Sequence, residues 1–125
     1  MKVERPIYLN LWRIRFPITA IVSILHRISG VVIFLGLPLL LYLLGKSLNS
    51  QESYNQTALV LGAPGMKLAI WIILSAIVGH FFAGIRHLLM DTGLGESLKA
   101  GRISAWLVLI ISILIVIILG LWIWS

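Results

Sequence analysis

The 125-residue sequence contains no cysteine and only four acidic residues, against ten lysines and arginines and three histidines. Without cysteine the chain forms no disulfide, no thiolate metal site and no thiol nucleophile, so a transition metal would have to be held by imidazole or carboxylate groups. Charged residues make up 11% of the chain, which is about half the share found in soluble domains. Hydrophobic residues make up 60%, and the mean hydropathy is +1.06. This composition indicates an integral membrane protein and excludes a soluble globular domain.

Three long apolar segments predict three transmembrane helices, at residues 18–46, 65–90 and 103–124. About 20 apolar residues cross the hydrocarbon core of a bilayer, and each segment reaches that length. Pro17 suits the first turn of the first helix, where its missing N–H leaves no hydrogen bond unmade. The fold class that we expect is therefore all-α, in a single membrane-anchor domain.

The segments outside these helices are predicted to lie at the two membrane surfaces. Residues 1–17 are basic with interspersed apolar side chains, which favours a cytoplasmic interfacial segment over an unstructured tail. Residues 49–65 are polar and contain several turn-forming residues, so we expect a loop there. A second, shorter loop is expected at residues 96–102.

Most of the basic residues fall on one side of the predicted membrane domain. The N-terminal side holds Lys2, Arg5, Arg13, Arg15 and Arg27, and the second loop holds Arg86, Lys99 and Arg102. By the positive-inside rule this side faces the cytoplasm, which predicts a cytoplasmic N-terminus and a periplasmic C-terminus in a bacterial inner membrane. Because the basic residues flank apolar runs and do not form one face, the formal charge of +6 does not indicate nucleic-acid binding.

The stretch Ser23-Ile24-Leu25-His26-Arg27-Ile28-Ser29-Gly30 places polar groups where the first predicted helix enters the membrane. A charge at that depth is costly and is usually retained for a function. On a helix, Ser23, Arg27 and Gly30 share one face, with His26 offset by roughly 60°. This face suits a ligand with an apolar body and a polar head, such as a quinone, a haem propionate or a lipid phosphate. The alternative is that Arg27 only reaches out to lipid headgroups.

His80 is an isolated imidazole inside the second predicted helix, which is otherwise uncharged from Leu68 to Ile85. An imidazole in hydrocarbon either hydrogen-bonds to another helix or ligates a metal. Ala76 and Gly84, one turn to either side, would leave space for a flat ligand such as a porphyrin. Small residues also serve the packing of membrane helices, however, so these residues favour neither interpretation over the other.

His87 follows seven residues after His80, about 10.5 Å along the helix, so the two cannot ligate one iron from opposite sides. We expect His87 to pair with Asp91 at i+4 instead. If His80 binds haem, the second axial ligand must then come from another chain, which predicts a hetero-oligomer. The sequence contains no catalytic triad, carboxylate dyad, phosphate loop or flavin motif, and its predicted spans hold no acidic residue that would suggest a proton or cation pathway.

Two motifs, in order and at matching spacing, resemble one family. They are Ser23-x-x-His26-Arg27-x-Ser29-Gly30 and His80-x-x-x-Gly84-Ile85-Arg86-His87-x-x-Met90-Asp91-x-Gly93, preceded by Arg5-Pro6. The pattern is similar to the cytochrome b membrane-anchor subunit of succinate dehydrogenase, respiratory complex II. The lead-in Arg15-Phe16-Pro17-Ile18-Thr19-Ala20-Ile21 resembles the proteobacterial members in particular.

The resemblance implies a haem b shared with a second small membrane-anchor subunit that supplies the other axial histidine. His80 matches the axial haem ligand, and His26 and Arg27 match contacts of the haem propionates. Ser23 and Arg27 match the pair that contacts the quinone. The resemblance further implies a flavoprotein subunit that oxidises succinate and an iron–sulfur subunit that delivers the electrons to ubiquinone.

Two alternatives to this function stay open from the sequence. The chain could anchor a quinol:fumarate reductase, which has the same architecture and runs in the opposite direction. From a different class, it could be a haem-free membrane scaffold or a small transporter subunit. By itself the chain is expected to carry no succinate-oxidising site.

Overall fold

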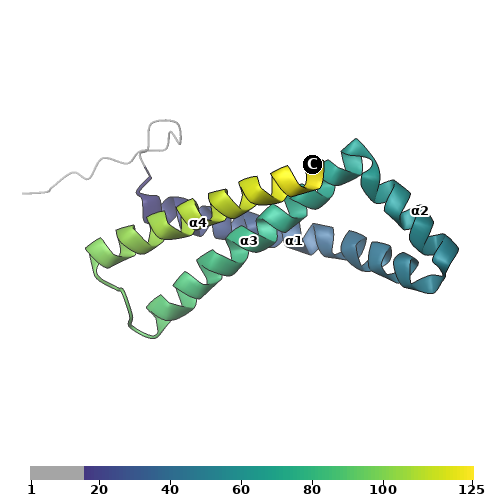
Figure 1. Ribbon diagram of the computed structural model, residues 1–125. Helices are drawn as coiled ribbons and strands as arrows, with labels where there is room; N and C mark the ends of the chain where they lie inside the picture. The colour runs from purple at the N-terminus through teal and green to yellow at the C-terminus, as the bar shows by residue number, and fades with distance from the viewer. Residues whose placement is uncertain (1–15) are drawn as a thin grey trace, which may run out of the picture.

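The computed structural model describes residues 16–125, so most of the interfacial segment expected at residues 1–17 lies outside the described residues. The described part contains four α-helices, α1 (Ile18–Asn49), α2 (Gln51–Gly62), α3 (Pro64–Asp91) and α4 (Leu98–Trp124), and no strand (Figure 1). Three of them, α1, α3 and α4, are long and apolar enough to cross a membrane. The expected all-α membrane fold is therefore confirmed.

The prediction of a loop at residues 49–65 was wrong, because most of this segment forms helix α2. Ser50 is extended and ends α1, and its side chain accepts a hydrogen bond of 3.0 Å from the Ser53 N–H. Such an N-cap satisfies one of the free N–H groups of the first turn, and the acidic Glu52 in that turn is favourable at the positive end of the helix. Polar composition suggested a loop, but the local capping pattern favours a helix.

The prediction of a second loop at residues 96–102 was also partly wrong. Ser97 caps α4 by accepting a hydrogen bond of 3.1 Å from the Ala100 N–H, so the helix already begins at Leu98. The true connection is short and turns at Gly93 and Gly95, whose φ angles are 87° and 69°. Only glycine adopts such positive φ angles without steric strain.

The buried residues of α1 recur every seven positions, at Val22, Ser29, Gly36 and Leu43. A seven-residue repeat keeps one narrow stripe of a helix against its neighbour over several turns. The small side chains in the middle of this stripe allow α3 to approach closely, as in many membrane helix pairs. Ile73 of α3 packs directly over Gly36 and is only 6% exposed.

Helices α3 and α4 are joined near the C-terminus by an aromatic contact. Trp71 on α3 donates a hydrogen bond of 2.9 Å from its indole nitrogen to the carbonyl of Val116. Its ring lies against Gly120 and meets Trp124 edge to face, with ring centroids 5.6 Å apart. The indole N–H, which would be costly to leave unpaired in hydrocarbon, is satisfied in this way.

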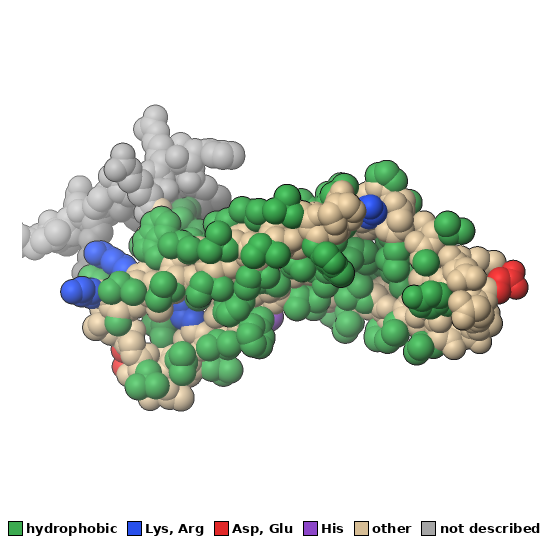
Figure 2. Space-filling model, in the orientation of Figure 1, with side chains coloured by type: hydrophobic (Ala, Val, Ile, Leu, Met, Phe, Trp, Pro, Cys, Tyr) green, Lys and Arg blue, Asp and Glu red, His purple; other side chains and the backbone are tan. Residues whose placement is uncertain are grey.

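The start of α1, the end of α3 and the start of α4 lie together at one end of the bundle (Figure 1). We call this the basic end, because Arg27, Arg86, Lys99 and Arg102 lie in these segments. At the opposite end, α2 and the last turns of α1 form a helical hairpin. Figure 2 shows apolar side chains over the long sides of the molecule and charged side chains gathered towards its ends, as expected for helices that cross a bilayer.

Candidate functional site

A cavity of about 930 Å³ opens at the basic end, between α1 and α3. Its polar lining comprises Ser23, His26 and Arg27 from α1, Arg86, His87 and Asp91 from α3, and Glu96 from the connecting loop. Small or apolar residues complete the wall: Thr19, Ala20, Val22, Ala83 and Met90. The structure therefore brings Ser23, His26 and Arg27 to a common cavity, together with residues more than 55 positions away in the sequence.

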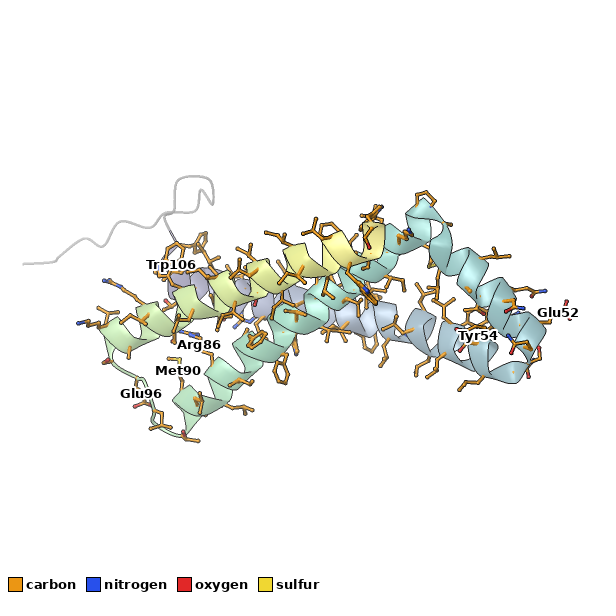
Figure 3. All side chains as sticks on the ribbon, viewed as in Figure 1. Glu52, Tyr54, Arg86, Met90, Glu96 and Trp106 are labelled. Atoms are coloured by element: carbon orange, nitrogen blue, oxygen red, sulfur yellow. The ribbon has the colours of Figure 1, made fainter. Side chains whose placement is uncertain are left out.

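The charges around this cavity are arranged with the basic groups on the helices. Arg27 and Arg86 approach from α1 and α3, while Glu96 lies on the loop after α3, and Asp91 is the last residue of α3. Figure 3 shows Arg86 between α3 and α4, with Met90 one turn further along and Glu96 on the loop. A polar or anionic head in this cavity would therefore meet two guanidinium groups, with the Asp91 and Glu96 carboxylates also on the lining.

Arg86 has a role that the sequence analysis missed, since it was considered only as a basic flank. Its Nε donates a hydrogen bond of 3.0 Å to Ser104 Oγ, and its Nη2 donates one of 3.2 Å to the carbonyl of Gly101. Arg86 is half-buried, and these bonds hold its guanidinium against α4. The signal available in the sequence was that Arg86 is the single arginine of α3 and directly follows its uncharged stretch. The hydrogen-bond partners of Arg86 could not be inferred from the sequence.

His80 lies next to this cavity, in contact with the residues of α1 that line it. Its ring stacks on the ring of His26, with centroids 4.2 Å apart and planes inclined by 23°. Its Nδ1 lies 3.0 Å from Ser29 Oγ and 3.1 Å from the backbone carbonyl oxygen of His26. His80 therefore does make the interhelical hydrogen bond that was one of its two interpretations, through only one of its ring nitrogens.

Glycines at the α1–α3 contact make room for these two rings. A Cβ atom at Gly30 would lie 3.3 Å from Cε1 of His80, and one at Gly84 would lie 3.6 Å from Nε2 of His26. From the sequence, the small residue Gly84 beside His80 favoured neither a flat ligand nor helix packing over the other. In the structure the histidines of the chain itself lie beside both glycines, so these glycines serve the helix contact and are not evidence for a ligand.

Ser29 was quoted in the sequence motif but not singled out as a site residue. It is 9% exposed and belongs to the buried stripe of α1. It follows His26 by three positions, and residues at this spacing lie on neighbouring parts of one helix surface. That spacing was the available signal, although the partner on α3 is 51 positions away.

The outer imidazole, His87, pairs with Asp91 as expected, with Nε2 and Oδ2 3.5 Å apart. Both side chains are largely exposed, so this pair contributes little to stability. The His87 ring lies 6.2 Å from that of His26. Within residues 16–125 no cluster of three or more histidine, aspartate or glutamate side chains is arranged to hold a bare metal ion.

A second, apolar cavity of about 460 Å³ runs among α1, α3 and α4. It shares Val22, His26 and Ala83 with the polar cavity, so the two spaces meet at this wall. Ser75 and Ser112 also line it, and their buried hydroxyl oxygens have no hydrogen-bond partner among the described residues.

Comparison with known proteins connects this arrangement to one family. The sequence profile of the family described as "Succinate dehydrogenase/Fumarate reductase transmembrane subunit" matches residues 1–119. The succinate dehydrogenase cytochrome b556 subunit of Coxiella burnetii is 50% identical over 125 residues, covering 99% of this chain and 100% of that protein.

More distant relatives are similar over nearly the same length. The succinate dehydrogenase cytochrome b556 subunit of Rickettsia felis is 31% identical, covering 93% of this chain and 90% of its own. The succinate dehydrogenase cytochrome b560 subunit of Reclinomonas americana is 33% identical, covering 87% and 79%. With the matched profile, the identity to these relatives and the three membrane-spanning helices, this chain belongs to the succinate dehydrogenase/fumarate reductase transmembrane subunit family.

Proposed function

We propose that this chain is a membrane anchor of a succinate:quinone oxidoreductase that binds haem b through His80 and forms part of the ubiquinone-reduction site with Ser23 and Arg27. The observation that carries the proposal is the position of His26. This residue lines the polar cavity together with Ser23 and Arg27, and its ring also stacks on that of His80. A quinone in the cavity and a haem on His80 would therefore be separated by about one side chain.

The cavity offers the groups that a quinone head requires. The Ser23 hydroxyl can donate a hydrogen bond to a quinone carbonyl, and the Arg27 guanidinium stabilises the negative charge that develops as the ring takes up electrons. A volume of about 930 Å³ accommodates a small-molecule head with room to spare. Arg86, which α4 holds in place, supplies a second positive charge on the opposite wall.

His80 also fits the role of an axial ligand. Its Nδ1 is engaged by α1, and within residues 16–125 no hydrogen bond reaches its Nε2, so this nitrogen is available for a metal. His26 does not supply the opposite ligand in this arrangement, because rings stacked at 4.2 Å leave no space for a flat group between them. The second axial histidine is therefore assigned to a second small anchor subunit, while His26 and Arg27 lie where propionates could contact them.

A haem held by His80 would supply a one-electron redox centre. The contribution of this chain is to orient one imidazole, to keep it inside the hydrocarbon and to place it beside the quinone cavity. Succinate oxidation itself is proposed to take place in a flavoprotein partner, with an iron–sulfur subunit as the second partner that passes the electrons on. They would dock at the basic end, which we assign to the cytoplasm in a bacterial inner membrane, with the C-terminus in the periplasm. The relatives carry the name succinate dehydrogenase, which favours succinate oxidation over fumarate reduction as the direction.

The test is to compare quinone reduction with dye reduction in the purified assembly. Ser23→Ala removes a neutral hydrogen bond and should lower quinone reduction about 2- to 12-fold, whereas Arg27→Leu removes a charge-assisted one and should lower it about 10- to 150-fold. Succinate oxidation by an artificial dye, which does not need the quinone, should persist in both variants. His80→Ala should abolish the haem spectrum.

Ser47→Ala is a suitable control, because Ser47 lies on the same helix, is partly exposed and, within residues 16–125, bonds only to the carbonyl of Leu44. It should leave both rates and the spectrum unchanged. An equal loss of quinone and dye reduction in the Ser23 and Arg27 variants would show that these residues hold the assembly together. An unchanged haem spectrum in His80→Ala, or a wild-type assembly without haem, would refute the assignment of His80.

A further inference from the structure

The contact between Ser29 and His80 determines which nitrogen of the imidazole carries its proton. A serine hydroxyl has a single hydrogen to donate. Ser29 donates it to the backbone carbonyl of His26, three residues earlier, at 2.7 Å. Towards Nδ1 of His80, 3.0 Å away, the Ser29 oxygen can therefore act only as an acceptor.

The second neighbour of His80 Nδ1 leads to the same conclusion. This atom also lies 3.1 Å from the carbonyl oxygen of His26, and a carbonyl oxygen can only accept. A deprotonated Nδ1 would direct its lone pair at two acceptor oxygens, which is repulsive. A protonated Nδ1 instead shares one N–H between both oxygens, so a neutral His80 has its proton on Nδ1 and a free lone pair on Nε2.

We propose that Ser29 is a positioning residue for His80, which it holds as the Nδ1-protonated tautomer with Nε2 directed away from α1 as the ligand nitrogen. The proposal rests on the assignment of His80 as a haem ligand. Two features keep this contact in place. Ser29 is 9% exposed in the α1–α3 contact, so water does not replace its hydroxyl. The adjacent Gly30 lies against the edge of the His80 ring, since a Cβ there would be 3.3 Å from Cε1.

The hydrogen bonds to Nδ1–H have a consequence for the bound metal. An acceptor on the outer N–H of a ligating imidazole raises the basicity of the ligating nitrogen, and partners of this kind typically change metal affinity about 10- to 100-fold. A more basic ligand favours the more positive ferric iron over the ferrous iron. Loss of the Ser29 acceptor should therefore raise the haem reduction potential. Because the His26 carbonyl remains as an acceptor, we expect an effect at or below the low end of that range.

The experiment compares the haem of the intact assembly containing Ser29→Ala, Ser29→Cys or Ser29→Thr. Alanine removes the acceptor, cysteine keeps a similar shape with a weak acceptor, and threonine keeps the hydroxyl. The ratio by which the site binds ferric haem more tightly than ferrous haem should fall about three- to tenfold in Ser29→Ala and Ser29→Cys. At 59 mV per tenfold for one electron, this corresponds to an upward shift of about 30 to 60 mV in a potentiometric titration. The g values of the ferric haem should change with it, and Ser29→Thr should stay close to wild type in both measurements.

Ser47→Ala again provides a matched control, since Ser47 makes the same i−3 bond on α1, at 2.7 Å, without a partner on α3. It should leave the potential unchanged. Loss of haem from the alanine and cysteine variants while the threonine variant retains it would also support the proposal, because the hydroxyl would be the distinguishing group.

Three results would overturn the inference about Ser29. They are an unchanged potential and EPR spectrum in Ser29→Ala and Ser29→Cys, a downward shift, or the same loss of haem from Ser29→Thr as from the other two variants. Each leaves His80 as the ligand of the wild-type assembly. A wild-type assembly without haem, or a haem that survives His80→Ala, instead refutes the proposed function, so the two failures are distinguishable.

Discussion

Gly36 of α1 lies directly against the Ile73 side chain of α3, and its replacement by alanine should force these helices apart. A Cβ atom there would be 2.7 Å from Cγ1, 2.8 Å from Cδ1 and 3.2 Å from Cγ2 of Ile73. Carbon atoms pack at about 3.5–4.0 Å, so the nearest contact is about 0.8–1.3 Å too short. Ile73 is β-branched and nearly fixed in its helical rotamer, so it cannot turn away from the added methyl group.

The expected effect is best measured against a second glycine of the same helix. Overpacking of this kind costs about 1–3 kcal/mol. Gly36→Ala also gains up to about 1 kcal/mol of helix propensity, which partly conceals the clash. Gly45→Ala gains the same propensity, but a Cβ at Gly45 meets nothing within 4 Å. We therefore expect the Gly36 variant to be about 1–3 kcal/mol less stable than the Gly45 variant.

The assay is unfolding by SDS in mixed micelles, followed by tryptophan fluorescence. A double-mutant cycle identifies the clash, because Ile73→Ala removes all three of the crowded carbon atoms. The effects of Gly36→Ala and Ile73→Ala should then be less than additive, with a favourable coupling of at least about 1 kcal/mol. Equal stability of the Gly36 and Gly45 variants, or strict additivity in the cycle, would refute this account of the α1–α3 contact.

Two further contacts, both between α3 and α4, can be tested by the same unfolding assay. Arg86→Met loses two interhelical hydrogen bonds, which at about 0.6–1.7 kcal/mol each should lower stability by about 1–3 kcal/mol. Ser104→Ala loses one of these bonds and should lower stability by about half as much. Unchanged stability in either variant would show that the bonds of Arg86 do not hold α3 against α4. Trp71→Phe loses the indole bond to α4 and some packing, for about 1–2 kcal/mol. Trp106, which is 55% exposed, is its control; a Trp106→Phe variant that is destabilised as much would show that the bond of Trp71 has no special role.

The three membrane-spanning helices were predictable because a bilayer places the same demand on every segment that crosses it. Each span needs about 20 apolar residues, and this can be recognised from the summed hydropathy of consecutive side chains, without knowing what packs against them. Accordingly α1 (Ile18–Asn49), α3 (Pro64–Asp91) and α4 (Leu98–Trp124) cover the predicted segments and extend beyond them. The helix α2 (Gln51–Gly62) was missed, because polar composition was given more weight than the capping residue that precedes it.

Part of the candidate site was also predictable from single residues. Ser23, His26 and Arg27 were noted because polar groups at the edge of a span are unusual, and they do line one cavity. The pairing of His87 with Asp91 followed from their i+4 spacing on one helix. Both inferences depend only on the geometry of a single helix, which the sequence determines by itself.

The contacts between helices depended on the tertiary structure. The amino-acid sequence determines how long and how apolar each helix is, but the rotation of each helix about its axis is decided by packing against the others. That rotation brings Ser29 and His26 of α1 to the Nδ1 of His80, and it places Arg86 against Ser104. It also directs the rings of His26 and His80 towards Gly84 and Gly30, so that side chains of the chain itself lie in this space. Such pairings join residues 18 to 58 positions apart, for which the local sequence carries no distance information.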